Sequence, residues 1–196
     1  MTADRLAQQL DFIAAMDQLK HVLRQTFLID DHRRENDAEH SWHLCLMAIA
    51  LAEHANEEVD LLRVLKMVIL HDLVEIDAGD TFAYDVEGNR DKEDREALAA
   101  DRIFGLLPDE QGRELRTLWE EFEGRRSPEA RFAAALDRLQ PMLLNYRGGG
   151  EAWRRHDVRA PQVVERNRHI AEGSQALWEY GRELIERAVS EGKLAE

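Results

Sequence analysis

Helical periodicity is the feature that most limits the fold of this chain. Apolar residues recur every three or four positions along most of its 196 residues, whereas alternation with a period of two, bounded by turn residues, is hard to find. The first helical stripe has one apolar face, formed by Leu6, Leu10, Ile13, Met16 and Leu19. The pattern predicts an all-α protein, and we expect this stripe to pack on the core.

Capping residues, prolines and glycines divide the rest of the chain into further helices. Asp60 is a predicted N-cap, and Ser127 is a predicted N-cap followed by a proline at the first helical position. Polar, aperiodic stretches at residues 30–37 and 77–89 predict loops. We expect helices over about residues 3–23, 38–55, 61–74, 90–107, 109–124, 129–146 and 161–190. The prediction is one all-α domain of about seven helices spanning residues 1–196, with a C-terminal helix over about 161–190.

Net charge limits the partners of the protein. Forty acidic residues outnumber 26 basic ones, giving a formal net charge of −14. Such a field repels polyanions, so we expect no nucleic-acid partner. A small anion remains possible, because a metal ion and a few arginines can reverse the potential locally.

The number of cysteines and the distribution of apolar residues indicate the cellular compartment of the protein. The lone Cys45 cannot form an internal disulfide, which fits a reducing compartment. No stretch reaches the roughly 18 consecutive apolar residues typical of a membrane span, and the N-terminus lacks the apolar run of a signal peptide. We expect a cytoplasmic protein without a membrane partner.

The most informative motif is the dipeptide His71-Asp72, at the end of the most apolar predicted helix. Burial of these two polar side chains costs several kcal/mol unless they are paired or bind a metal ion. For an isolated dipeptide of this kind, a helix cap or a pair with a nearby arginine or lysine is the commoner explanation.

Two further residues favour a metal site. His40 lies near the start of a predicted helix, and Asp137 lies within one, among small and apolar neighbours. Asp137 taken alone is better explained by a salt bridge to Arg138 or Arg131. Together, His40, His71, Asp72 and Asp137 offer imidazoles and carboxylates that suit one divalent ion such as Mn²⁺, Co²⁺, Zn²⁺ or Mg²⁺.

In this H…HD…D order the sequence resembles the HD-domain superfamily of metal-dependent phosphohydrolases, over about residues 19–146. Glu39-His40, His71-Asp72 with Glu75, Gly79-Asp80 and Leu136-Asp137 are similar to the 5′-deoxynucleotidase subgroup. The resemblance implies that Glu75 positions or protonates the reacting groups, that Asp80 contacts the sugar and that Arg24 binds substrate.

The sequence departs from the pattern of the subgroup after Arg24, where Gln25-Thr26 replaces the usual tryptophan and proline. Sugar preference therefore stays open, and Arg33 or Arg34 are alternative phosphate-binding cations or plain surface residues. Without its neighbours in the motif, Glu75 would be read as a solvated helix-end glutamate. His43, one turn from His40, is a candidate neighbour of the ligands, and we expect His169 at the surface or on a helix face.

Residues 73–136 contain no histidine, and the two-metal branches of the superfamily place additional histidines there. The resemblance thus implies a mononuclear site. The expected function is a metal-dependent phosphomonohydrolase that releases phosphate from (deoxy)nucleoside 5′-monophosphates. The alternatives are hydrolysis of another small phosphate ester or diester, and a noncatalytic metal-containing module that binds nucleotide. We also expect a homodimer, in which the helices over residues 90–107 and 161–190, the latter with Trp178 and Tyr180, supply the contacts.

Overall fold

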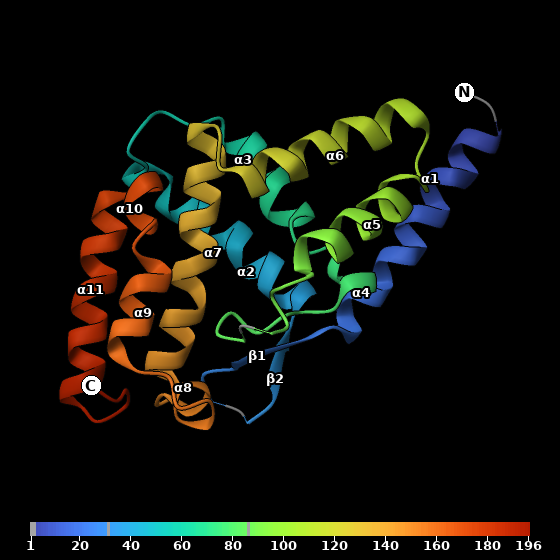
Figure 1. Cartoon of the computed structure of the whole chain (residues 1–196). Helices are drawn as coiled ribbons and strands as arrows, with labels where there is room; N and C mark the ends of the chain where they lie inside the picture. Colours follow the sequence, from blue (N-terminus) through green and yellow to red (C-terminus); the bar gives the residue numbers. More distant parts are fainter. Residues whose placement is uncertain (1–2, 31, 86) are drawn as a thin grey trace.

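The all-α prediction is confirmed by the structure, a computed structural model that describes residues 3–30, 32–85 and 87–196 (Figure 1). Residues 31 and 86, in the two predicted loops, lie outside the described residues. The helices are α1 (Ala3–Met16), α2 (Asp37–Leu51), α3 (Leu61–Leu70), α4 (Glu75–Ala78), α5 (Lys92–Phe104), α6 (Asp109–Gly124), α7 (Pro128–Arg147), α8 (Glu151–Arg155), α9 (Ala160–Asn167), α10 (Ile170–Gly173) and α11 (Gln175–Ser190). The short 3₁₀ helices η1 (Asp17–His21) and η2 (Ala52–His54) follow α1 and α2.

Helix α7 is the centre of the packing, in contact with α2, α3, α6, α10 and α11 (Figure 1). Its inward face is made of small and apolar side chains that are fully or almost fully buried, among them Phe132, Ala133, Ala135, Leu136 and Leu139. The predicted cap is confirmed: the Ser127 hydroxyl oxygen accepts a hydrogen bond from the backbone N–H of Ala130 at 3.2 Å. Asp137 therefore lies inside a helix that the core surrounds.

A two-stranded antiparallel sheet joins α1 to α2 and was not predicted. Strands β1 (Leu23–Phe27) and β2 (Arg34–Asn36) pair with Leu23 opposite Asn36. We expected residue 23 to end a helix and residues 30–37 to form a loop. These strands are too short to show a period-two pattern, and pairing between the two neighbouring segments is what forms them. The pairing places Arg24 beside the first turn of α2.

The apolar stripe of the first helix is only partly buried, contrary to our expectation. Leu19 is buried, but Leu6, Leu10 and Ile13 are more than half exposed. Helix α1 lies at the edge of the molecule (Figure 1), and polar contacts hold its first part to α6, including a hydrogen bond from Gln9 to Gln111. Periodicity thus predicted the helix correctly but not what covers its apolar face.

The predicted C-terminal helix over residues 161–190 is divided in the structure into α9, α10 and α11. Gly173 lies so close to α7 that an added Cβ would be 2.2 Å from the carbonyl oxygen of Arg131. Ser174 then adopts an extended conformation and caps α11, because its side chain accepts a hydrogen bond from the N–H of Leu177. Close packing against α7 therefore explains the break. Within the described ranges, no helix is both long enough and apolar enough to cross a membrane.

Candidate metal centre

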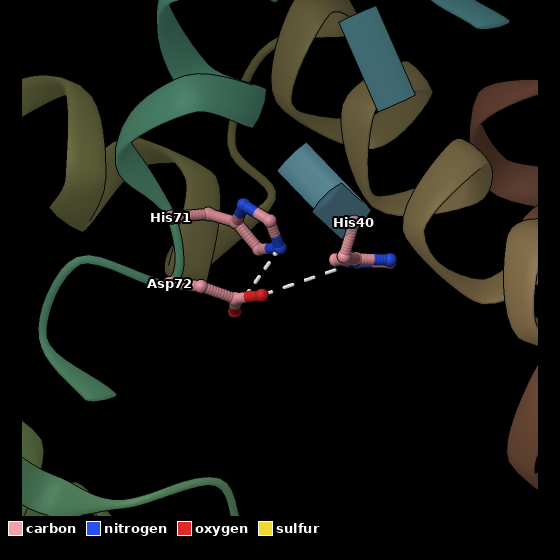
Figure 2. Close-up of side chains that lie close together, drawn as sticks. All are labelled: His40, His71 and Asp72. Atoms are coloured by element: carbon pink, nitrogen blue, oxygen red, sulfur yellow. Dashed lines mark ion pairs between the residues drawn. The ribbon is translucent and has the colours of Figure 1, made fainter. Parts of the chain in front are cut away.

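Local structure brings His40 and the pair His71-Asp72 to the same place. A capping box starts α2, in which Asn36 accepts from the N–H of Glu39 and the Glu39 carboxylate accepts from the N–H of Asn36. This puts His40 in the first turn of α2, fully buried. Helix α3 ends at Leu70, so His71 and Asp72 directly follow its C-terminal end. Figure 2 shows the three side chains pointing toward one another.

All four predicted ligands converge, although they come from three helical segments. The Nε2 atom of His40 is 3.0 Å from Oδ1 of Asp137 and 4.0 Å from Oδ2 of Asp72. The Nε2 atom of His71 is 3.1 Å from Oδ1 of Asp72 and 3.8 Å from Oδ1 of Asp137. All four side chains are buried. The role of these residues as metal ligands stays a prediction, but their positions meet its first requirement.

His71 shows that this set of donors suits a cation. Its Nδ1 atom is 3.0 Å from the carbonyl oxygen of Val68, which can only accept, so Nδ1 carries the ring proton. In the neutral form of the ring Nε2 directs a lone pair at the Asp72 and Asp137 oxygens, and this buried atom has no hydrogen-bond partner. Only a proton or a metal ion between these atoms removes the repulsion. A backbone carbonyl at the second ring nitrogen is a common arrangement around metal-binding histidines.

The electrostatics of the four residues also favour bound positive charge. Burial lowers the pKa of His71, but the negative charges of Asp72 and Asp137 outweigh it and raise that pKa to about 10. Burial raises the pKa of Asp72, yet His71 and Arg24 hold it well below its usual range. Asp137 behaves likewise, with Arg138 and the two histidines lowering its pKa against burial. The carboxylates are thus ionised and in need of compensation.

Arg24 lies among carboxylates and is deeply buried. Its Nη1 atom is 2.7 Å from Oδ2 of Asp72 and 3.1 Å from Oδ1 of Asp37, while Nη2 is 4.0 Å from Oδ1 of Asp137. Asp37, Asp72 and Glu75 form a second group of clustered carboxylates. Since the guanidinium already contacts two of them, we keep the prediction of a single metal ion. Arg33, the alternative cation, lies on the surface and pairs with Glu39 at 3.0 Å.

Glu75 and Asp80 border the same centre. Glu75 starts α4 and is buried, and burial together with the negative charges of Asp72 and Asp37 raises its pKa well above the ordinary value. Its carboxyl group is therefore harder to ionise than that of an ordinary glutamate. Gly79 has a φ of +77°, a conformation that favours glycine, and it turns the chain so that Asp80 lines the cavity. Burial, against the opposing charge of Arg24, raises the pKa of Asp80.

A cavity of about 680 Å³ opens onto the predicted ligands. His71, Asp72 and Asp137 line it together with Arg24, Glu75 and Asp80. Gln25 and Thr26 also face it, so the positions where the resemblance departs from the subgroup do border the space for a ligand. Phe82, Tyr84 and Trp153 give the cavity an aromatic wall. Its volume is within the usual range for small-molecule sites.

Several residues of the site were missed in the sequence. Asp37 is fully buried beside Arg24, and the visible capping motif of Asn36 and Glu39 could have placed it in the first turn of α2. Buried Glu35 lies 3.6 Å from Nδ1 of His40 and accepts a hydrogen bond from Gln140. We know of no local sequence signal for that contact, because it joins a strand to two helices.

The two other histidines with stated expectations differ in outcome. Nδ1 of His43 is 3.2 Å from the amide nitrogen of Gln140, which donates to Glu35, so His43 reaches His40 only through two intermediates. His169, which we expected at the surface or on a helix face, is half-buried and lines the cavity. The break after α9 turns it inward.

Known proteins of the same kind identify the family. The sequence profile of the HD domain matches residues 16–178, more than the 19–146 segment that carries the motifs. The chain belongs to the HD domain family. The 5′-deoxynucleotidase HDDC2 of Danio rerio is 32% identical over 136 residues, which make up 68% of this chain and 66% of that protein. The Homo sapiens protein of the same name is 30% identical over 135 residues, covering 68% and 65%. The match thus spans slightly less than two thirds of these relatives.

Solved structures give the same result for the fold. A predicted metal-dependent phosphohydrolase from Magnetospirillum magnetotacticum superposes with a TM-score of 0.93 and 51% identity, over 98% of this chain and 99% of that one. A conserved hypothetical protein from Pyrococcus furiosus superposes with a TM-score of 0.62 at 23% identity, over 89% of this chain and 99% of that one, and shows the fold alone. The HD domain fold therefore extends over nearly the whole chain.

Proposed function

We propose that this HD domain protein is a metal-dependent phosphomonohydrolase that releases phosphate from (deoxy)nucleoside 5′-monophosphates. The observation that carries the proposal is the convergence of His40, His71, Asp72 and Asp137, of which the last three line a cavity. Relatives named 5′-deoxynucleotidase, and a relative at 51% identity named as a metal-dependent phosphohydrolase, support it. Fold membership alone would not select a substrate.

The size and lining of the cavity support a nucleotide as substrate. About 680 Å³ is enough for a nucleoside monophosphate, and the aromatic side chains of Phe82 and Tyr84 offer faces for a base. Asp80 is positioned to accept a hydrogen bond from a sugar hydroxyl. Because Gln25 and Thr26 line the cavity where the subgroup has tryptophan and proline, we expect weak discrimination between ribose and deoxyribose.

Each residue of the centre has a defined role in the proposal. The four ligands would hold one divalent ion, which supplies Lewis-acid stabilisation of negative charge on the phosphate. Glu75, whose pKa is raised by burial, would donate a proton to the leaving 5′-oxygen while water attacks phosphorus. Arg24 positions Asp72 through the 2.7 Å contact, and it lines the cavity within reach of a substrate. The reacting group is thereby held between positive charge and a proton donor.

Phosphate release from a panel of ribo- and deoxyribonucleoside 5′-monophosphates tests the proposal. We expect turnover with added Mn²⁺ or Co²⁺, complete loss after chelation and recovery when metal is restored. Nucleoside 3′-monophosphates and cyclic nucleotides serve as controls for position and bond type. Turnover of other esters or diesters alone would favour a different hydrolase of the family. Metal-dependent nucleotide binding without turnover would favour the noncatalytic module.

We also propose that the protein forms a homodimer, and α2 offers a further surface for it beside the two helices expected from the sequence. Trp178 packs against the core, but Tyr180 on α11 is 38% exposed and Leu98 on α5 is 71% exposed. Helix α2 exposes Trp42, Leu46 and Ile49 on one face, with Trp42 65% exposed. A solvent-facing apolar stripe of this kind favours self-association. Light scattering after size exclusion should give a dimer mass for the wild type and a monomer mass for Leu46→Arg, with Leu62→Arg at an exposed position of α3 as the control. A monomeric wild type would contradict the proposal.

A cytoplasmic location remains part of the proposal. The single thiol of Cys45, half-buried and with its pKa raised by burial, supports a reducing compartment. Cell fractionation would check it.

A further inference from the structure

Four basic side chains line one part of the cavity, although they come from separate segments. Arg125 follows α6, Arg138 lies on α7, Arg166 lies on α9 and His169 lies between α9 and α10. In a chain with a net charge of −14, this gathering of positive charge is local. It lies beside the metal centre, because Nη2 of Arg138 is 3.7 Å from Oδ2 of Asp137.

Arg138 and Arg166 each have a buried guanidinium N–H without a hydrogen-bond acceptor. The side chain of Arg166 takes part in no hydrogen bond or ion pair among the described residues. Nη1 of Arg125, by contrast, is 3.7 Å from Oε2 of Glu172. The Nε atoms of both Arg138 and Arg166 are buried without an acceptor. A buried guanidinium N–H that has no acceptor is unfavourable, and natural proteins retain few such groups without a functional reason.

The pKa values of Arg166 and His169 are lowered in part by the positive charges around them. Burial, followed by repulsion from Arg138, lowers the pKa of Arg166 to about 10. Burial and the charges of Arg138 and Arg125 lower the pKa of His169 to about 4, so this ring is neutral at pH 7. The fold therefore holds the group together against electrostatic repulsion, which an anion between these side chains would relieve.

Arg24 is less suited than this group to neutralise a phosphate. Its guanidinium already contacts Asp72 and Asp37, and Glu35 and Asp137 lie within 4.0 Å of it. Among the described residues Arg138 forms an ion pair with Asp137 alone, a predicted metal ligand, so a bound ion would compete for that partner. Charge that is not yet compensated is thus found at Arg138 and Arg166.

We propose that Arg138, Arg166 and His169 form the anion-binding position of this cavity and that it takes the phosphoryl group of the substrate. The assignment rests on the proposed function for the identity of the substrate, but phosphate binding itself can be measured independently. Two planar guanidinium groups match phosphate oxygens through paired hydrogen bonds, and the neutral His169 ring can add a further donor. Arg138 and Arg166 are binding residues in this proposal, and they do not replace Glu75.

Titration calorimetry with inorganic phosphate tests the site directly. The full chain is measured with Mn²⁺ present and again after chelation, and Arg166→Met is compared with Arg168→Met. Arg168 is a matched control, since it lies two residues away, is exposed and pairs with Glu165 on the surface. Loss of one charge-assisted pair predicts about a tenfold weaker phosphate affinity for Arg166→Met under both conditions. Wild-type affinity in Arg166→Met would overturn the proposal.

Thermal unfolding and kinetics separate this role from a structural one. Because Arg166 is repelled by Arg138 and has no ion-pair partner, we expect the melting temperature of Arg166→Met to stay the same or rise. A fall of several degrees with unchanged phosphate affinity would instead assign Arg166 to the fold. In the nucleotide assay kcat/KM should fall about tenfold for Arg166→Met, and Arg166→Lys should recover part of it. Wild-type protein that binds phosphate through Arg166 but hydrolyses no nucleotide would contradict the proposed function and leave the anion site intact.

Discussion

Replacing Asp72 by asparagine should reduce nucleotide hydrolysis about 10³-fold, corresponding to roughly 4 kcal/mol of lost transition-state stabilisation. The Oδ1 atom of Asp72 faces His71 and its Oδ2 atom faces Arg24. Asparagine keeps the shape of the side chain but removes the negative charge that balances a divalent ion. Measured by phosphate release in saturating Mn²⁺, the loss should be accompanied by loss of bound metal, which atomic absorption quantifies.

The control for this substitution is Asp94→Asn, which removes the same charge from an exposed position on α5. It should leave both activity and metal content unchanged. Because Asp72→Asn also weakens the contact with Arg24, circular dichroism and thermal unfolding must show that the variant is folded. A folded Asp72→Asn protein with wild-type activity would exclude the proposed centre.

Glu75→Gln should lower the rate of nucleotide hydrolysis about 10²- to 10⁴-fold, the usual range for removal of a general acid. Burial and the charges of Asp72 and Asp37 raise the pKa of the Glu75 carboxyl, which favours the protonated form that can give a proton to the leaving alkoxide. Glutamine fills the same space and cannot release that proton. Steady-state kinetics with a nucleoside 5′-monophosphate measure the effect on kcat.

An aryl phosphate distinguishes proton donation from a role in positioning. Its phenolate leaving group departs without a proton, so Glu75→Gln should lose roughly tenfold or less with this substrate. Glu93→Gln, at an exposed position of the cavity wall, is the matched control and should resemble the wild type with both substrates. Equal losses of Glu75→Gln on nucleotide and aryl phosphate would rule out general-acid catalysis.

The substitutions at Asp72, Glu75 and Arg166 test two parts of the cavity in which the charge imbalance has opposite sign. The centre has more ionised carboxylates than Arg24 can balance, whereas the cavity wall at Arg138 and Arg166 has more positive charge than its neighbours balance. A divalent ion would compensate the first imbalance and a phosphate group the second. An acidic protein can thereby hold an anionic substrate without a basic surface.

The identity of the predicted ligands was accessible from the sequence. His71 and Asp72 stand out because a strongly apolar helix ends in two polar side chains, and His40 and Asp137 stand out because packing would prefer carbon at their positions. The capping box and the Ser127-Pro128 start could also be read locally, since they depend on residues three positions apart. Local geometry is what such patterns encode.

What the amino-acid sequence determined by itself is therefore the helical class, most helix starts and the residue types that meet at the candidate metal centre, because these follow from periodicity, capping and the energetic cost of burying charge. Only the tertiary structure decided that β1 brings Arg24 among carboxylates, that Gly173 breaks the last helix against α7, and that Arg138, Arg166 and His169 meet in one cavity. Each of these outcomes depends on contacts between segments far apart in the chain, for which no local pattern carries information.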